Sequence, residues 1–483
     1  MASVPDTSQQ IEVPLAVDLD GTLIRSDMLW ESLTRLIRQN PLALLAVPVW
    51  WLRGRAFLKQ QLAARVQVDA TTLPYNEPFL AWLREQKRMG RRLVLATASD
   101  LAMARPVAEH LGLFDEVLAS DGKTNLRAHA KLAALTKKFG ERGFDYAGNS
   151  SVDLEVWSGS REAIVVNASE SLARRAAGCA KVGKTFLSTA SPLKSFLRCL
   201  RPHQWIKNLI VFVPVLTAHQ LGNEIIRRQA AWAFGAFCLC ASAAYLLNDL
   251  VDIEADRHHL TKRNRPFASG ELPLSVGLFA PPLLLAAGLG ISFTLSAGFA
   301  SVIAGYFIAT LAYSWQIKRI PLLDVFFLAG LYTMRLVAGH VATRVAWSAW
   351  LLVFSMFIFL SLALMKRFQE LQSVRQQNQH ELKGRGYAAG DLELVTTLGL
   401  VSGFIAVLVL ALYVNSDQVQ KLYARPTMLL LICPLLLYWI ARVWFLAHRG
   451  QMHDDPTAFA FKDWLSYVIG ALTLAVMWFA TGH

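Results

Sequence analysis

Three aspartates near the middle of the chain have the spacing of a cation-binding site. Asp249, Asp252 and Asp256 follow a long apolar run at residues 230–247. If this run is a helix, intervals of three and four residues put the three carboxylates on one helical face. Carboxylates grouped in this way repel one another unless a cation lies between them, and Mg²⁺ is usually bound by a few carboxylates together with substrate phosphates. The spacing therefore predicts a site for Mg²⁺.

Polar and basic residues on both sides of these aspartates extend the prediction. Asn248 stands immediately before the first aspartate, and Lys262 and Arg265 follow the last one. The two basic side chains can donate to phosphate oxygens that a metal leaves uncovered. Acids for a metal beside bases for a phosphate predict that a diphosphate binds here. The alternative is an ordinary charged loop after a membrane helix.

A separate pair of aspartates follows the first apolar run of the chain. Residues 13–17 have the pattern of a buried strand, and Asp18 and Asp20 come directly after it. Acids two residues apart at the end of a strand point into the crevice where an open α/β sheet binds its ligand. One such carboxylate can attack a phosphoryl group, and the other can act as acid and base.

The stretch from Val13 to Leu23 resembles the first motif of the haloacid dehalogenase (HAD) superfamily. The resemblance implies that Asp18 is the nucleophile and Asp20 the general acid/base. It also implies Mg²⁺ binding and phosphate binding by a further set of side chains: Asp18, Asp20, Asn149 and Asp153 for the metal, and Thr97 and Lys131 for the phosphate. Asn149 stands where the family usually has aspartate, which removes one negative charge. Two alternatives stay open, an active phosphatase and a regulatory or docking module that keeps the fold.

The elements that must position these residues fall into two classes. Of the 483 residues, 54% are hydrophobic and only 17% are charged, which is too apolar for an ordinary soluble protein. We therefore expect an α/β Rossmann-like HAD domain at residues 1–187 with a helical cap at about 26–89. A linker at 188–192 would lead to an all-α bundle of nine transmembrane helices at 193–483.

Nine apolar stretches in the second half of the chain are the candidate spans. They are residues 208–222, 228–248, 275–295, 297–314, 321–341, 346–366, 391–413, 427–447 and 463–481. Several reach the ~20 residues that a bilayer requires. Lys and Arg concentrate in the loops after every second span, so the positive-inside rule predicts that these loops and the N-terminal domain are cytoplasmic. We expect an integral protein of a bacterial cytoplasmic membrane, without a signal peptide. The net charge of +13 then reflects these loops and anionic substrates, and nucleic acid is not expected as a partner.

The stretch from Asn248 to Arg265 looks like the first aspartate motif of the UbiA superfamily of membrane prenyltransferases. Residues 200–208 (LRPHQWIKN) and the motif from Tyr313 to Lys318 resemble the decaprenyl-phosphate phosphoribosyltransferase branch. The resemblance covers roughly residues 193–483. It implies Mg²⁺ as cofactor, with polyprenyl phosphate and phosphoribosyl pyrophosphate as substrates. It implies substrate contacts from Lys207, Asn208, Asn248, Lys262, Arg265, Tyr313 and Lys318.

Further polar residues lie in or near the later spans. Most aromatic prenyltransferases of the superfamily carry a second acid pair after the fourth span, whereas this chain has Asp324 and Leu328. This loop has fewer carboxylates than in those enzymes and contains Lys318, so it is better suited to bind an additional phosphate than a second metal ion. Arg335 lies at membrane depth, where an ionisable residue is a functional candidate unless it forms a packed ion pair, for example with Asp324. Lys366 closes the sixth span, either as a phosphate donor or within a plain cluster at the helix end.

These features together predict transfer of a 5-phosphoribosyl group to a polyprenyl phosphate, with Asp249 and Asp252 central to catalysis. The HAD domain is then equipped to remove the 5-phosphate from the product. The main alternative is a UbiA-type enzyme that moves a prenyl group from prenyl diphosphate to an aromatic or lipid acceptor. The missing second acid pair argues against that alternative.

One segment of the cap, Pro41–Leu52, is strongly apolar. It is short for a span, and Pro48 interrupts it. One interpretation is a buried cap helix. The other is a surface patch that touches the bilayer, flanked by Arg38, Arg53 and Arg55.

Overall fold

The computed structural model describes residues 13–121, 125–188, 191–377, 380–382, 384–452 and 455–482. The chain divides into two compact units. One unit comprises Met1–Leu200 together with Tyr245–Pro281, and the other comprises Arg201–Ala244 together with Pro282–His483. The segment with Asp249, Asp252 and Asp256, called the aspartate loop below, therefore belongs to the same unit as the N-terminal domain.

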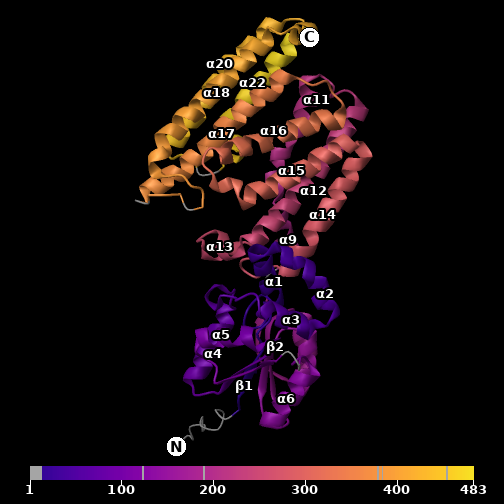
Figure 1. Ribbon diagram of the computed structural model, residues 1–483, viewed down its shortest axis with the longest axis vertical. Coiled ribbons are helices and arrows are strands. Elements are labelled where there is room, and N and C mark those ends of the chain that lie inside the picture. The colour runs from indigo at the N-terminus through magenta and orange to yellow at the C-terminus, as the bar shows by residue number, and fades with distance from the viewer. Residues whose placement is uncertain are drawn as a thin grey trace, which may run out of the picture. The chain divides into compact units, whose positions relative to one another are not determined.

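A six-stranded parallel sheet forms the centre of the first unit (Figure 1). Its strands are β1 Leu15–Val17, β2 Leu93–Asp100, β3 Glu116–Ser120, β4 Asp145–Gly148, β5 Glu162–Ala168 and β6 Lys181–Leu187. The order is β3-β2-β1-β4-β5-β6, so the direction of winding reverses beside β1. Strands of such a sheet are covered on both faces, which explains their continuous apolar runs. The predicted α/β class is confirmed, and the crevice at the carboxyl end of β1 is where a ligand binds in such sheets.

Helices cover both faces of the sheet. They are α4 Glu77–Arg88, α5 Leu101–Leu111, α6 His129–Phe139, α7 Leu154–Ser158 and α8 Glu170–Ala177, with the short turn η4 Ser151–Asp153 before α7. In Figure 1, α4 and α5 lie on one side of the strands and α6 on the other. This arrangement follows from right-handed crossovers between parallel strands, because the chain changes face where the strand order reverses.

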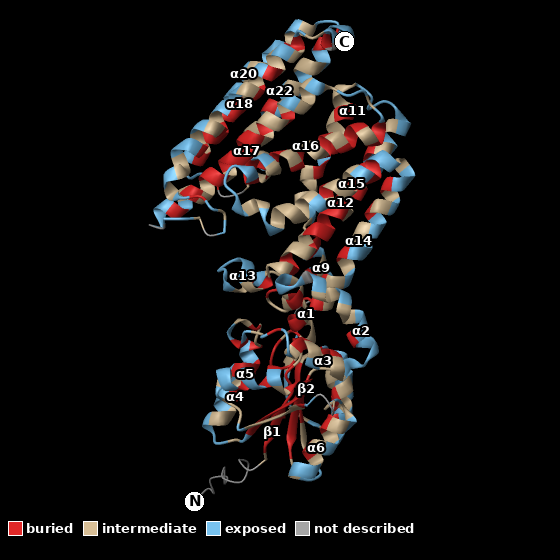
Figure 2. Cartoon of the chain, viewed as in Figure 1, coloured by how far each residue is buried: buried red, intermediate tan, exposed pale blue. Residues whose placement is uncertain are grey.

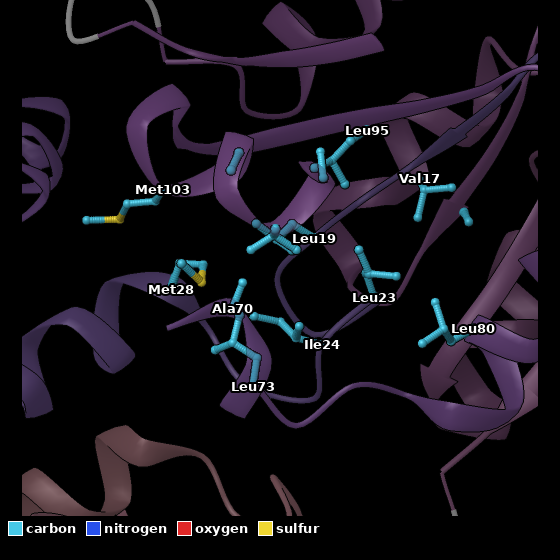
Figure 3. Close-up of a cluster of buried hydrophobic side chains, with 14 of the residues drawn as sticks. Val17, Leu19, Leu23, Ile24, Met28, Ala70, Leu73, Leu80, Leu95 and Met103 are labelled. Carbon is cyan, nitrogen blue, oxygen red and sulfur yellow. The ribbon is translucent and has the colours of Figure 1, made fainter. Parts of the chain in front are cut away.

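Short helical pieces between β1 and α4 build the cap. They are α1 Met28–Gln39, η2 Pro41–Ala46, α2 Val47–Leu52, α3 Arg55–Ala63 and η3 Ala70–Thr72. Figure 3 shows the apolar cluster that joins cap and sheet, in which Leu19 and Leu23 from the turn after β1 meet Met28 and Leu73 from the cap. This cluster fixes the backbone on both sides of Asp20, since Leu19 and Leu23 are fully buried.

The apolar segment Pro41–Leu52 is only partly buried. Trp50 points into the core of the domain, but Leu45 and Leu52 are 81% and 86% exposed. Figure 2 shows α2 largely in the colours of exposed and intermediate residues. The interpretation as a buried cap helix is therefore wrong for most of its side chains.

The first unit continues beyond the predicted linker. Residues 189 and 190 of that linker lie outside the described residues, and α9 Pro192–Leu200 begins at its last position. The unit also contains α13 Ile253–His258, η6 Lys262–Asn264 and the start of α14 Leu274–Leu295.

The second unit is helical. Its elements are α10 Pro202–Trp205, η5 Ile206–Phe212, α11 Val213–Thr217, α15 Ala297–Trp315, η7 Ile317–Arg319, α16 Leu323–Thr343, α17 Ala349–Gln376, η8 Ala389–Asp391, α18 Leu392–Val414, α19 Asp417–Leu422, η9 Pro426–Leu431, α20 Ile432–His448, α21 Pro456–Ala460 and α22 Trp464–Ala480. Helix α12 Glu224–Val251 belongs to this unit as far as Ala244, and α14 belongs to it from Pro282 onward. Buried side chains of α16, α17, α18 and α20 form one of its cores.

Seven helices in the described part of the chain are long and apolar enough to cross a membrane. They are Glu224–Val251, Leu274–Leu295, Ala297–Trp315, Leu323–Thr343, Ala349–Gln376, Ala389–Val414 and Pro426–His448. The prediction of nine spans is not confirmed. In the stretch 208–222, η5 is followed by the short helix α11, which begins at Val213 with Pro214 in its first turn and ends at Thr217. The last stretch forms Trp464–Ala480, a shorter apolar helix.

Candidate functional site

Asp18 lies directly after β1 in a chain of buried polar contacts. Lys131 from α6 donates from Nζ to Asp18 Oδ1 at 2.7 Å and to the hydroxyl of Tyr146 at 2.8 Å. Tyr146 in turn donates to Asp153 Oδ1 at 2.9 Å. Burial raises the pKa of Asp18 to about 7, although the Lys131 ammonium opposes this shift. The structure thus brings together three residues that the sequence predicted from separate motifs.

Asp20 is held from both sides. Its Oδ1 accepts from the backbone N–H of Met28 at 2.8 Å, and its Oδ2 accepts from Ser99 Oγ at 2.7 Å. Burial raises the pKa of Asp20 to about 6. Thr97, predicted to bind phosphate, is fully buried, and its Oγ1 accepts from the backbone N–H of Ser99. Ser99 contacts the acid directly, and Thr97 supports the turn that presents it.

The Asn149 loop follows β4. Asp153 Oδ2 accepts from the backbone N–H groups of Asn149 and Ser150 and from Ser150 Oγ, at 2.9 to 3.0 Å. Asn149 Oδ1 accepts from Thr22 Oγ1 at 3.3 Å. Asp153 therefore shapes the loop, while the Asn149 amide oxygen and Asp18 remain the oxygen donors suited to Mg²⁺.

The backbone is close-packed at this point. Gly21 has a φ of 75°, and a Cβ there would lie 2.1 Å from Asn149 Nδ2. Glycine is required both for the positive φ and for the close approach.

These acids line a cavity of about 1130 Å³ within the first unit. Cationic side chains are numerous in its wall: Arg25, Arg55, Lys59, Arg127, Lys131, Lys194 and Arg198. Trp30 and Trp51 add apolar surface. Asp27, Asp153 and Glu271 line the cavity as well as Asp18 and Asp20, and the seven cations outnumber these five acids. A cavity of this size and charge suits an anionic ester larger than a free phosphate.

The aspartate loop differs from its predicted form. Helix α12 ends at Val251, and Asp252 is the residue that precedes α13, so the three aspartates do not share one continuous helix. The interruption is local, because the Asp252 N–H still donates to Asn248 O and the Asp256 N–H to Asp252 O.

Two of these aspartates nevertheless converge. Arg265 Nη1 donates to Asp249 Oδ1 at 2.9 Å and to Asp256 Oδ2 at 2.7 Å. Both carboxylates are buried, and burial raises the pKa of Asp256 against the opposing effect of Arg265. Carboxylates that meet at one cationic nitrogen can also meet at a metal ion, so this donor set fits Mg²⁺. Asp252 is half-buried nearby in sequence, and Lys262 is exposed on η6.

Helix α13 is fastened to the cap by ion pairs. Arg257 donates to both carboxylate oxygens of Glu31 on α1, at 2.7 and 3.1 Å, and both side chains are buried. Glu254 pairs with Arg35 and Arg38 of the same helix. These contacts have no local signal in the sequence, since the partners are more than 200 residues apart.

In the helical unit, Arg335 is buried in a polar and aromatic shell. It donates to Asn208 Oδ1 at 2.9 Å, to the Tyr306 hydroxyl at 2.8 Å and to a backbone carbonyl. The rings of Phe237, Tyr306 and Tyr332 lie 5.0 to 5.4 Å from its guanidinium carbon.

Asp324 is bound by other residues than Arg335. Arg367 donates to it from Nε at 2.6 Å, and the Tyr387 hydroxyl donates at 2.6 Å. Tyr313 accepts from Arg367 and from Arg385, while Lys318 lies half-buried on η7. The alternative of an Arg335–Asp324 ion pair is therefore wrong.

Asp455 joins two predicted substrate residues. Its Oδ2 lies 3.1 Å from Lys366 Nζ and 3.5 Å from Lys207 Nζ. Burial raises the pKa of Asp455, but the two ammonium groups outweigh it and hold that pKa well below its usual value. Asp455 was not predicted from the sequence as a functional residue. Its only local signal is an aspartate before Pro456, a helix-start pattern that says nothing of distant lysines.

In the described ranges, no group of three or more His, Cys, Asp or Glu side chains is arranged to hold a metal ion. At both acid clusters, a metal would need further oxygen ligands. Substrate phosphates and water commonly supply them for Mg²⁺.

Comparisons with known proteins assign the two parts of the chain to two different families. Residues 209–466 match the UbiA prenyltransferase family, and residues 15–157 match the haloacid dehalogenase-like hydrolases. The chain is 39% identical over 466 residues to the uncharacterized protein y4nM of Sinorhizobium fredii, which covers 95% of this chain and 90% of that protein. The nodulation protein NoeC of Azorhizobium caulinodans is 35% identical over 277 residues, 57% of this chain and 90% of that protein. The decaprenyl-phosphate phosphoribosyltransferase of Mycolicibacterium smegmatis is 37% identical over 219 residues, 44% of this chain and 69% of that protein.

Proposed function

This integral membrane protein belongs to the UbiA prenyltransferase family and carries an N-terminal haloacid dehalogenase-like domain, and we propose that it is a polyprenyl-phosphate phosphoribosyltransferase whose product is dephosphorylated by the same chain. The donor is phosphoribosyl pyrophosphate. The acceptor is a polyprenyl phosphate. Similarity to the mycobacterial phosphoribosyltransferase supports this choice over other UbiA reactions.

The observation that carries the choice of substrates is the environment of Asp324. It is fully buried and accepts hydrogen bonds from Tyr387 and from Arg367, which also pairs with Glu370. The region that would otherwise supply a second acid pair thus presents no free carboxylate from Asp324. Lys207 and Lys366 lie in the same helical unit and share Asp455, and they suit a second phosphate-bearing substrate.

At the aspartate loop, Asp249, Asp252 and Asp256 would hold Mg²⁺. When bound, the ion offsets the charge that builds on the diphosphate oxygens of the donor. Lys262 and Arg265 then donate to diphosphate oxygens that stay uncovered. The bond between ribose C1 and diphosphate breaks while an oxygen of the polyprenyl phosphate bonds to C1. This nucleophile is already anionic, so the chain need not supply a general base.

The phosphatase step uses the cavity around Asp18. The Asp18 carboxylate attacks phosphorus of the ribose 5-phosphate, and Asp20 protonates the leaving ribose hydroxyl. Water then cleaves the aspartyl-phosphate, with Asp20 taking its proton, and inorganic phosphate leaves. Lys131 and the cationic wall hold the phosphate charge, and Asp18 and Asn149 would bind Mg²⁺, which neutralises the same phosphate. Since both acid clusters belong to one unit, we place both on the cytoplasmic side.

A purified full-length sample in lipid nanodiscs tests the transfer step. Given radiolabelled phosphoribosyl pyrophosphate, polyprenyl phosphate and Mg²⁺, it should form a labelled lipid. Given prenyl diphosphate and an aromatic acid, it should form no product. Efficient aromatic prenylation would favour the alternative function.

Mass spectrometry of the lipid products tests the phosphatase step. Wild type should yield polyprenyl-phosphoryl-ribose, whereas Asp18→Asn should accumulate the 5-phosphorylated lipid while transfer continues. Asp115→Asn is a matched control, because this partly exposed aspartate lies in the same domain away from the cavity. Identical product profiles for wild type and Asp18→Asn would favour a docking or regulatory role for the domain.

A further inference from the structure

The cap presents an apolar strip on its outer surface. The exposed members of this strip are Leu42, Leu45, Val49, Trp51 and Leu52. The strip is not a loose segment, because Trp50 between them is buried in the domain core and Arg65 lies over its ring at 4.7 Å. Contiguous exposed apolar side chains on an anchored element mark an interaction surface.

Cations border this strip. Arg38, Arg53 and Arg55 are all exposed, and residues 41–55 contain no acidic residue. Arg55 stacks on Trp51, and Arg53 stacks on Phe57. Tryptophan and arginine beside leucine are typical of helices that lie in the interface of a membrane. At 12 residues, η2 and α2 together are too short to cross one.

One side-chain contact joins helix α1 of the cap to a candidate membrane span. The ring of Trp30 packs edge-on against Phe279, with centroids 6.0 Å apart. Phe279 lies five residues after the start of the span Leu274–Leu295, which is about 7.5 Å along the helix. Helix α1 therefore packs against the first turns of a helix that is long and apolar enough to cross a membrane. The apolar strip follows α1 directly in the chain.

We propose that the strip Leu42–Leu52 lies in the bilayer interface, with its leucines among the acyl chains and its flanking arginines at anionic lipid phosphates. The consequence concerns access to Asp18. Trp51 and Arg55 also line the cavity that contains this aspartate, so the strip is continuous with the cavity wall. The phosphate end of a lipid-linked ester can then enter the cavity while its lipid tail stays in the bilayer. The membrane contact does not depend on which ester is cleaved.

Photo-crosslinking of the full-length protein tests this placement. p-Benzoylphenylalanine would replace Leu45 or Leu52 in protein reconstituted into vesicles of phosphatidylethanolamine and phosphatidylglycerol. A third position, Lys137 on α6, is exposed on the same domain and serves as control. We expect phospholipid adducts at positions 45 and 52 and none at 137. Adducts with a second copy of the chain would overturn the proposal in favour of a dimer interface. The absence of any adduct at 45 and 52 would also overturn it, since the strip would then face water.

A kinetic comparison provides a second measurement. The double substitution Leu45→Glu and Leu52→Glu changes two exposed side chains and leaves Trp50 in the core. Hydrolysis of a lipid-linked phosphate should fall about tenfold, whereas hydrolysis of soluble p-nitrophenyl phosphate should not change. An equal fall with both substrates would contradict a membrane role. If the domain cleaves neither substrate, the proposed phosphatase function fails, and the crosslinks alone still decide the membrane contact.

Discussion

Two clusters of aspartates lie in the same unit of the chain, and different groups neutralise their charge. Around Asp18, an ammonium, a tyrosine hydroxyl and backbone N–H groups hold the acids in place, and all of them are fixed by the sheet and its core. Around Asp249 and Asp256, one guanidinium that is 27% exposed bridges both carboxylates. The first cluster is organised before a ligand arrives, as covalent catalysis requires. In the second cluster, a complex of metal ion and diphosphate can displace the Arg265 guanidinium from the two carboxylates.

The largest expected effect follows from removing one acid of the second cluster. Asp249→Ala or Asp256→Ala should lower phosphoribosyl transfer by about 10³-fold, because stabilisation of the leaving diphosphate by a metal amounts to several kcal/mol. The radiolabelled lipid assay measures the loss. Glu254→Ala is the control, since this acid on α13 pairs with the arginines of α1. Near-normal transfer in either aspartate variant at saturating Mg²⁺ would refute the metal assignment.

The link between the clusters supplies the next prediction. Arg257 and Glu31 are 7% and 4% exposed, and deleting one partner leaves a buried charge. Arg257→Ala or Glu31→Ala should therefore destabilise the protein by about 3–5 kcal/mol, seen as a lower midpoint of thermal unfolding.

Two controls sharpen this test. Arg38→Ala removes an ion pair whose arginine and glutamate are 44% and 25% exposed, and it should cost less than about 1 kcal/mol. The double substitution of Glu31 and Arg257 by leucine should recover part of the lost stability, since it leaves no unpaired charge. Equal midpoints for Glu31→Ala and Arg38→Ala would mean that the buried pair contributes little.

The next prediction concerns Arg265, the cation that bridges the two carboxylates of the second cluster. Arg265→Gln leaves Asp249 and Asp256 without the shared guanidinium and should lower stability in EDTA by about 2 kcal/mol, the scale of hydrogen bonds to a charged group. Mg²⁺ should restore more stability to this variant than to wild type, because a cation again fills the space between the carboxylates. Arg263→Gln, an exposed neighbour, should behave as wild type. The same response to Mg²⁺ in all three proteins would show that the ion does not bind between these acids.

The sequence was most informative where chemistry depends on local order. Asp18 and Asp20 follow a strand, and Lys131 begins a helix, so the topology of a parallel sheet suffices to bring them to one crevice. The seven long spans likewise follow from length and apolarity. The prediction that one continuous helix carries all three aspartates was wrong at Asp252, where the helix is interrupted beside the cluster of charged side chains.

Contacts between distant segments had no local signal. Asp455 lies after the span Pro426–His448 and pairs with both Lys366 and Lys207. Nothing in a single sequence pairs residues 89 or more positions apart. The Glu31–Arg257 pair belongs to the same class. Such pairs depend on tertiary packing, which hydrophobic periodicity does not specify.

The smallest expected effect concerns Asn149, the position at which the first cluster has one negative charge fewer than its family. The Asn149→Asp substitution restores that charge in a loop already shaped by Asp153, so no rearrangement of the backbone is needed. One added carboxylate near Mg²⁺ should lower the concentration of Mg²⁺ for half-maximal hydrolysis of p-nitrophenyl phosphate about tenfold, which corresponds to about 1.4 kcal/mol. Turnover at saturating Mg²⁺ should change less, because Asp18 and Asp20 stay in place. Ser150→Ala serves as control, since it removes a contact to Asp153 without adding charge. If Asn149→Asp leaves the Mg²⁺ dependence unchanged, the amide does not contact the metal, and the first cluster binds it through Asp18 and substrate oxygens alone.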